Sequence, residues 1–213
     1  MIQRSANCPN CGAQVQFRWS SAVQTVCPYC RSILVRTDVD LAKVGEVADP
    51  PADSSPIQLG VEGLYRNKSF VVVGRIIYEY ELGAWNEWHL VFNDNSSGWL
   101  SDAQLEYAVS MLSNPGRALP AAKAVARGQH FQFHGASLQV TTLTKAHYRG
   151  VEGDLPFQYW DKSDVLFADL RGADARFGTI DYSESPPLLF LGEAVEFDDL
   201  RMTRLREFER WKR

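Results

Sequence analysis

The stretches Cys8-Pro9-Asn10-Cys11 and Cys27-Pro28-Tyr29-Cys30 decide the fold of the first part of this chain, and they contain all four of its cysteines. Two Cys-x-x-Cys pairs that lie fifteen residues apart are typical of a four-thiolate metal site. Each turn directs two sulfurs at one ion, and two turns complete a tetrahedron with Zn–S distances of about 2.3 Å. We therefore predict a zinc ribbon over residues 1–37. The expected ligands of its structural Zn²⁺ are Cys8, Cys11, Cys27 and Cys30.

Three other uses of the four cysteines are compatible with such a motif. Two disulfides would need an oxidising compartment, but the first residues lack the charged and then apolar pattern of a signal peptide. A redox pair of the thioredoxin type expects a βαβ unit, and the sequence shows no such pattern. Iron in a rubredoxin-like site stays open, because four thiolates suit both metals. Since all four sulfurs are in use, we expect a structural rather than a catalytic metal.

A linker follows the ribbon over residues 38–56. Its first part carries apolar residues at helical spacing, which predicts a short helix that Asp38 caps. Its second part, Asp49-Pro50-Pro51-Ala52-Asp53-Ser54-Ser55-Pro56, is too rich in proline for a regular element. We therefore place the domain boundary there.

Residues 57–213 carry the pattern of a β-rich body. Apolar and polar residues alternate over residues 75–80 and 87–93, and the short spacings between turn-forming segments are typical of antiparallel strands. The segments 65–73 and 133–141 both contain a strand end, a tight turn and a new strand. Two similar β halves therefore stay open as an alternative to a chance similarity of hairpins.

Two helices are predicted within this body. Ser101-Asp102-Ala103-Gln104 matches a capping box and predicts a helix over residues 101–113. Near the end of the chain, Asp198 or Asp199 is the candidate N-cap of a C-terminal helix. The expected fold is thus mainly β, with a small ribbon, an antiparallel body and these two helices.

The charge of the chain is unevenly distributed. The net charge is −4, yet residues 1–37 carry four arginines and no acidic residue, and hence +4 before metal binding. The rest of the chain therefore has a net charge of −8. Because an acidic body repels nucleic acid at long range, we expect protein partners rather than nucleic acid.

The sequence contains no segment that predicts a membrane span. The longest apolar run, residues 186–192, is far shorter than the roughly 20 residues of a spanning helix. No lipidation or targeting motif is present. We expect a cytoplasmic protein. Basic residues over 201–213 leave peripheral membrane association open, although acidic residues nearly cancel their charge.

Asp181, Tyr182 and Glu184 are the best candidates for a catalytic or ligand-binding site in the body. Two carboxylates with a phenol between them can carry out acid–base chemistry, whereas the plainer interpretation is a strand end followed by a tight loop. The stretch Trp85-Asn86-Glu87-Trp88-His89 suits either a stacking platform for a sugar or base, or the core of a sheet with one polar edge.

Three longer stretches resemble a known family. They are Val61-Glu62-Gly63-Leu64-Tyr65, Trp85-Asn86-Glu87-Trp88-His89-Leu90-Val91-Phe92 and Phe177-Gly178-Thr179-Ile180-Asp181-Tyr182-Ser183-Glu184-Ser185-Pro186-Pro187-Leu188. The chain is similar to a bacterial domain-of-unknown-function family, number 4178, whose members often carry an N-terminal zinc ribbon. The resemblance implies no established activity. The neighbouring genes of its members imply an accessory role in an envelope-associated or membrane-stress system.

Two hypotheses for function follow from the sequence. The first is a non-enzymatic adaptor or scaffold whose ribbon binds a protein partner. Trp, Tyr and Arg are favoured as anchors of interfaces, so the expected contact residues are Arg18, Trp19 and Tyr29. The alternative is a hydrolase or small-ligand-binding β domain with its site near Asp181 and Glu184.

Overall fold

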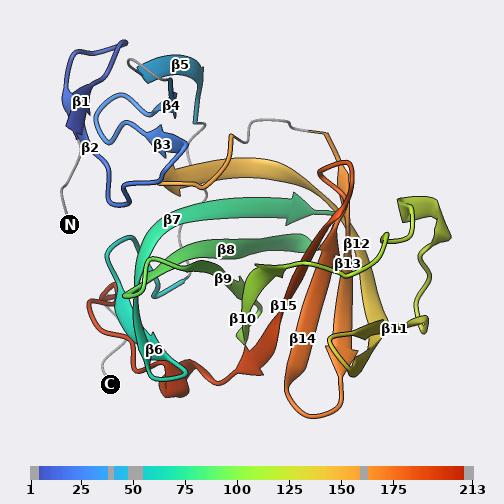
Figure 1. Ribbon diagram of the computed structural model, residues 1–213. Coiled ribbons are helices and arrows are strands. Elements are labelled where there is room, and N and C mark those ends of the chain that lie inside the picture. Colours follow the sequence, from blue (N-terminus) through green and yellow to red (C-terminus); the bar gives the residue numbers. More distant parts are fainter. Residues whose placement is uncertain (1–4, 38–40, 48–54, 159–162, 209–213) are drawn as a thin grey trace.

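The structure, a computed structural model, describes residues 5–37, 41–47, 55–158 and 163–208 (Figure 1). Antiparallel strands dominate these residues, which confirms the prediction of a mainly β protein. A small N-terminal module with two sheets lies against a larger closed sheet. No helix in the described ranges has the length and hydrophobicity needed to cross a membrane.

Each pair of cysteines lies in the turn of its own hairpin in the N-terminal module. One hairpin joins β1 (Ser5–Asn7) to β2 (Gln14–Gln16), and the other joins β3 (Gln24–Val26) to β4 (Ser32–Arg36). The two turns have the same backbone hydrogen bonds, because the amides of Gly12 and Arg31 donate to the carbonyls of Cys8 and Cys27 at 2.8 and 3.0 Å. The two hairpins therefore present their sulfurs from two similar loops.

The short helix predicted for the linker is wrong. Residues Leu41–Glu46 form strand β5, which pairs antiparallel with β4. Pairing satisfies backbone groups that β4 would otherwise leave unpaired along one edge, and it buries Leu41. This gain outweighs the helical spacing of three apolar residues. Asp38, the predicted cap, and most of the Pro-rich stretch lie outside the described residues.

Ten strands form the body. They are β6 (Glu62–Tyr65), β7 (Lys68–Tyr80), β8 (Gly83–Phe92), β9 (Ser97–Ala103), β10 (Glu106–Ser113), β11 (His130–Phe133), β12 (Ala136–Gly153), β13 (Val165–Gly172), β14 (Arg176–Asp181) and β15 (Leu188–Val195). Their order is β11-β12-β13-β14-β15-β10-β9-β8-β7-β6. The long strand β12 pairs with β13 through its first half and with β7 through its second half. This second pairing closes eight of the strands, β7–β10 and β12–β15, into a ring.

The internal helix predicted over residues 101–113 is wrong. These residues form β9 and β10, joined by a tight turn at Gln104 and Leu105, whose φ angles are 53° and 70°. The capping-box pattern was misleading because Asp102 serves a different purpose. Its buried carboxylate accepts hydrogen bonds from the side chains of Ser55 and Trp88, which tie the sheet to the segment before β6.

The predicted C-terminal helix is also absent from the described residues up to 208. Phe197–Leu200 form a single 3-10 turn that ends at Arg201, where φ is 45°. The chain then runs past β6, where the amide of Thr203 donates to the carbonyl of Glu62 at 2.8 Å. Docking against β6 thus takes the place of continued helix, because it buries Leu200 against the outer face of the closed sheet. Residues 209–213, the last part of the predicted helix, lie outside the described residues.

The ten strands consist of two halves with the same layout. In each half a short strand turns into a long one, at Tyr65–Lys68 and at Phe133–Ala136. Both long strands have a register shift, after Val72 in β7 and after Val140 in β12. A glycine amide donates to the carbonyl of each of these valines at 2.8 Å. These positions are all 68 residues apart, so the two similar halves suggested by the sequence exist in the structure.

The two halves meet at two seams. At one seam β7 pairs with β12, with His147 opposite Glu79. At the other β10 pairs with β15, with Met111 opposite Leu191. Each half packs its outer face against its own covering segment: residues 57–61 and 197–205 cover the first, and residues 119–131 cover the second. The inner faces of both halves surround a common interior.

The N-terminal module docks on the end of β12 through a buried carboxylate. Asp154, only 1% exposed, accepts hydrogen bonds from the Trp19 amide at 2.8 Å and from the Thr25 hydroxyl at 2.7 Å. The Trp19 ring packs edge-on against His89, with ring centroids 5.0 Å apart. Burial lowers the pKa of His89 to about 4, so its neutral ring donates through Nδ1 to the Asp154 carbonyl at 2.9 Å.

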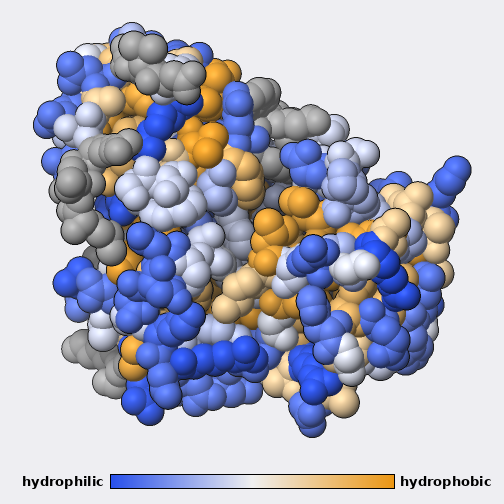
Figure 2. Space-filling model, in the orientation of Figure 1, coloured by the Kyte–Doolittle hydropathy of each residue, from blue (hydrophilic) through white to orange (hydrophobic). Residues whose placement is uncertain are grey.

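Figure 2 shows mostly hydrophilic side chains on this face of the molecule, with hydrophobic side chains gathered over the module and over the middle of the closed sheet. The module and the closed sheet share one apolar cluster. In that cluster Ile33 of β4 packs with Val151 and Leu155 of the body. The two parts are therefore joined by a packed interface as well as by the chain that links them.

Candidate functional site

The four cysteine sulfurs converge at one point of the module. All four lie within 4.8 Å of one another, with 3.7 Å between Cys8 and Cys30 and 3.8 Å between Cys11 and Cys27. A tetrahedron with metal–sulfur distances of about 2.3 Å has edges of about 3.8 Å. The sulfurs form no disulfide. The four cysteines therefore fit a tetrahedral metal ion.

Neighbouring groups support the thiolates. The Ser32 hydroxyl lies 3.2 Å from the Cys30 sulfur. Hydrogen bonds from Ser32 and then Asn10 lower the pKa of Cys30 to about 5, which favours the thiolate that a metal requires. Gly12 and Arg31 occupy equivalent turn positions with φ of 75° and 59°. The arginine in place of the more common glycine therefore keeps the turn, at the cost of a left-handed backbone.

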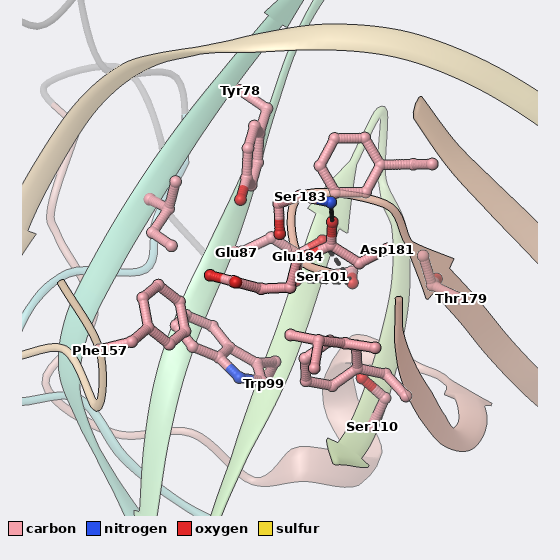
Figure 3. A pocket seen from close by; sticks show the side chains of 14 residues that line it. Tyr78, Glu87, Trp99, Ser101, Ser110, Phe157, Thr179, Asp181, Ser183 and Glu184 are labelled. Carbon is pink, nitrogen blue, oxygen red and sulfur yellow. Dashed lines mark hydrogen bonds between the residues drawn. The ribbon is translucent and has the colours of Figure 1, made fainter. Parts of the chain in front are cut away.

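A cavity occupies the interior of the closed sheet. Its volume is about 280 Å³, and it is lined from both halves of the sheet (Figure 3). Tyr78, Trp99 and Phe157 lie on one side, and the strand that carries Thr179 and Asp181 lies on the other. The remaining lining residues are Ile76, Glu87, Ser101, Ser110, Phe167, Ser183, Glu184, Leu188 and Phe190. The cavity thus combines aromatic walls with a few polar groups, as small-molecule sites do.

Glu87 projects from β8 into this interior. Its carboxyl accepts a hydrogen bond from Trp85 Nε1 at 3.0 Å. The Ser101 hydroxyl oxygen lies 2.9 Å from each of the two carboxyl oxygens. The pKa of Glu87 is raised to about 8, mainly by desolvation and to a smaller extent by the nearby carboxyls of Asp169 and Asp181, against the effect of the two hydrogen bonds. A carboxyl with this pKa is poised to gain or lose a proton near neutral pH.

Two other carboxyls share the interior. Asp181 accepts a hydrogen bond from the Ser183 amide at 2.8 Å, and burial followed by the charge of Glu184 raises its pKa. Asp169 accepts from the Thr179 hydroxyl at 3.0 Å, and burial raises its pKa too. Asp169 lines a second hollow of about 650 Å³ that shares Glu87 with the first. The first cavity is therefore lined by acidic and uncharged residues, whereas Lys145 and Arg171 also line the second hollow.

Ser110 adds a polar group without a partner. It projects from β10, is 4% exposed, and lines the cavity near Trp99. Among the residues that the structure describes, its hydroxyl has no hydrogen-bond partner. Buried hydroxyls are normally paired with protein, water or a ligand, so this group is available to a molecule in the cavity.

The structure brings some of the residues predicted from sequence together. Asp181 and Glu184 both line the cavity, whereas the phenol between them, Tyr182, packs in the outer cluster of the second half. His89 is buried beside Trp19 and does not line the cavity. Sequence reasoning thus located one edge of the cavity.

Of the three residues predicted to contact a partner, two are exposed and one is half-buried. Trp19 is half-buried against His89 and serves the docking of the module. Tyr29 is 72% exposed, and Arg18 is exposed as well. Both line a groove of about 710 Å³ between the module and the end of β12.

Glu87, Ser101 and Ser110 were not predicted as site residues. Glu87 shares one face of its strand with Trp85 and His89, and this period of two was visible in the sequence. What the pattern does not reveal is that this face turns toward the inside of a closed sheet. Ser101 was assigned to a helix cap, which removed it from consideration.

The comparisons with known proteins concern the closed sheet. No curated protein and no solved structure matches the chain. A family model described as a domain of unknown function (DUF4178) matches residues 58–197. The match begins just before β6 and ends at the 3-10 turn after β15, so it contains the whole closed sheet and leaves out the module. Since it covers well over half of the residues, the chain belongs to the family of the domain of unknown function DUF4178.

Proposed function

We propose that this protein binds a small ligand inside its closed sheet, with a structural Zn²⁺ in the N-terminal module. The observation that carries the proposal is the cavity of about 280 Å³ between the two halves. Its size lies just below the range for small-molecule sites, which begins at about 300 Å³, so the ligand should be small. Its lining has aromatic walls, the carboxyls of Glu87 and Asp181, and the unpartnered hydroxyl of Ser110. Such a lining supports binding of a small molecule with an apolar part and one polar group.

Zinc is the metal that we propose for the four cysteines. The converging sulfurs and the absence of an open position in a four-thiolate site support a structural role. The ion would keep β3 and β4 in place against the end of β12. This contact lies near the cavity, because the rings of His89 and the cavity residue Trp99 have centroids 5.0 Å apart.

Filling the cavity should abolish ligand binding and leave the fold intact. The test is Ser110→Phe. The residue equivalent to Ser110 in the second half of the sheet is Phe190. A phenylalanine is therefore compatible with this position of the strand. The probes are hexyl and phenylethyl compounds with ammonium, hydroxyl or carboxylate head groups. A probe at a hundred times its Kd stabilises the wild type by about 2.7 kcal/mol, seen as a rise in Tm.

Ser137→Phe is the matched control, because it makes the same change on an exposed hairpin position. We expect it to keep the rise in Tm that Ser110→Phe loses. If no probe of any head group raises the Tm of the wild type, or if Ser110→Phe binds as the wild type does, the proposed function is wrong.

A second candidate function is the adaptor suggested by the sequence. The observation that favours it is the groove between module and body, which Arg18 and the exposed Tyr29 both line. A double variant, Arg18→Ala with Tyr29→Ala, should lower recovery of a protein partner from extracts of the host about tenfold, while Tm stays unchanged. Leu82→Ala, which truncates an equally exposed side chain elsewhere, is the control. Equal recovery with all three proteins would rule out the groove as the contact.

A further inference from the structure

We propose that the ligand of the cavity is a small organic cation, a protonated amine or a quaternary ammonium group attached to an apolar portion. This inference names the ligand class of the proposed function and rests on it. Three features of the cavity carry the inference: its charge, its aromatic walls and a hydroxyl without a partner.

The charge of the lining is of one sign. Glu87, Asp181 and Glu184 line the cavity, and none of the described lining residues is a lysine, arginine or histidine. A buried carboxylate is costly unless a positive charge or several hydrogen bonds compensate it. The donors to Glu87 are those of Trp85 and Ser101, and the donor to Asp181 is the amide of Ser183. A cation in the cavity would supply the missing counter-charge.

The aromatic walls suit the same kind of ligand. The Trp99 and Phe157 rings stack with centroids 5.8 Å apart, and the Tyr78 and Phe167 rings meet edge to face at 4.9 Å. Aromatic faces attract ammonium groups within about 6 Å through their quadrupole, more strongly when water is excluded. The same rings offer apolar contact to an alkyl or aryl body. The walls and the carboxyls therefore favour one molecule that has both a charged head and an apolar body.

Ser110 supplies an independent indication of a ligand. Its hydroxyl faces the cavity and has no partner among the described residues, and the residue as a whole is only 4% exposed. A hydroxyl oxygen accepts a hydrogen bond from an N–H group of a protonated amine. The lining thus offers an uncharged acceptor in addition to the carboxyls.

The arrangement disfavours two other classes of charged ligand. An anion would meet three carboxyls without a basic partner. A metal ion needs several ligand atoms close together, and the four cysteines are the only such group among the described residues. Among the described residues, the interior carboxyls therefore do not form a metal-binding group of three or more ligands.

Three probes that differ only in their head groups test the inference. Hexylammonium, hexanol and hexanoate each have six carbons in an unbranched chain, and titration calorimetry at pH 7.5 gives the Kd of each. We expect hexylammonium to bind about tenfold or more tightly than hexanol, because a charged hydrogen bond contributes more than a neutral one. Hexanoate should not bind measurably. Hexanol or hexanoate binding as tightly as hexylammonium would overturn the inference and leave the proposed function standing, whereas no binding by any probe would overturn both.

Isosteric variants connect the preference to the cavity. Glu87→Gln and Asp181→Asn each remove a charge and keep the shape, so each should weaken hexylammonium about tenfold and leave hexanol unchanged. Glu106→Gln removes an exposed carboxylate that pairs with Arg171 outside the cavity, and it should change neither value. A loss for hexanol as large as that for hexylammonium would mean that the variants damage the site, and an unchanged preference would overturn the role of the carboxyls.

Proton release gives a further measurement of the same binding event. The groups that face Glu87 are the donors of Trp85 and Ser101 and the acidic side chains of Asp169 and Asp181. Burial, with a smaller effect of the two acidic side chains, outweighs these donors and raises the pKa of Glu87 to about 8. Glu87 is therefore largely protonated at pH 7, and a bound cation should expel its proton. The apparent enthalpy of hexylammonium binding should then vary with the ionisation enthalpy of the buffer for the wild type and not for Glu87→Gln. No buffer dependence in the wild type would overturn Glu87 as the counter-charge.

Discussion

Replacing Cys27 with serine should release the metal and unfold the N-terminal module, with the largest loss of stability that we expect from one substitution. The Cys27 side chain is fully buried, and a serine hydroxyl does not ionise to replace its thiolate. Metal binding to such small sites supplies on the order of 10 kcal/mol, which a module of this size cannot obtain from its own core. Elemental analysis should find about one zinc per wild-type chain and none in the variant.

Ser32→Ala is the control for this substitution. It removes the hydroxyl near the Cys30 sulfur and keeps all four thiolates, so it should retain the metal with roughly 10- to 100-fold weaker affinity. The closed sheet of Cys27→Ser should remain folded with a lower Tm, because Asp154 would lose the Trp19 and Thr25 donors. A Cys27→Ser protein that still carries one metal ion would contradict the assignment, and wild-type protein that holds iron would contradict zinc.

Glu87→Gln should raise the stability of the protein at pH 8 to 9 and change it little at pH 4. Burial raises the pKa of Glu87 from 4.5 to about 8. Below pH 4.5 the carboxyl is protonated in both folded and unfolded states. Between pH 4.5 and 8 the unfolded state releases the proton and the folded state keeps it, so the wild type loses stability as the pH rises. The full difference is on the order of a few kcal/mol.

Denaturant unfolding of both proteins between pH 4 and 9 measures this difference. The free energy of unfolding of the wild type should fall through the window relative to that of Glu87→Gln, and the two curves should run parallel above pH 8. Glu106→Gln, with its exposed and paired carboxyl, should follow the wild type. A Glu87→Gln protein that is less stable than the wild type at pH 8 would show that the ionised carboxyl stabilises the fold, contrary to this account.

The sequence was sufficient for the parts of the fold that depend on local pattern. The spacing of the cysteines indicated their convergence, and alternation indicated the long strands β7 and β8. The predicted helices do not form because three apolar residues at helical spacing, or a capping box, are weak patterns that strand pairing can override. Ser101 and Asp102 pair with β8 on one side and with β10 on the other, and this tertiary pairing decided their conformation.

The candidate cavity could be predicted only at one edge. Asp181 and Glu184 drew attention because they lie close together in the chain, whereas Glu87 and Ser110 reach the same cavity through the register of other strands. Their proximity depends on ring closure by β7 and β12, and the pairing partner of a strand edge is not encoded in its own alternation. The acidic interior was therefore hidden in a sequence whose charges resemble those of an ordinary surface.

The repeated layout of the closed sheet has a consequence for how a guest molecule would be oriented. A two-fold relation with identical side chains would present every wall residue twice, and a guest could enter equally well with either end first. Here the equivalent positions differ: Glu87 corresponds to Phe167, and Ser110 corresponds to Phe190. The scaffold is nearly symmetric while its lining has a direction, so a polar head and an apolar tail would meet different surroundings at the two ends, and one of the two orientations would be preferred.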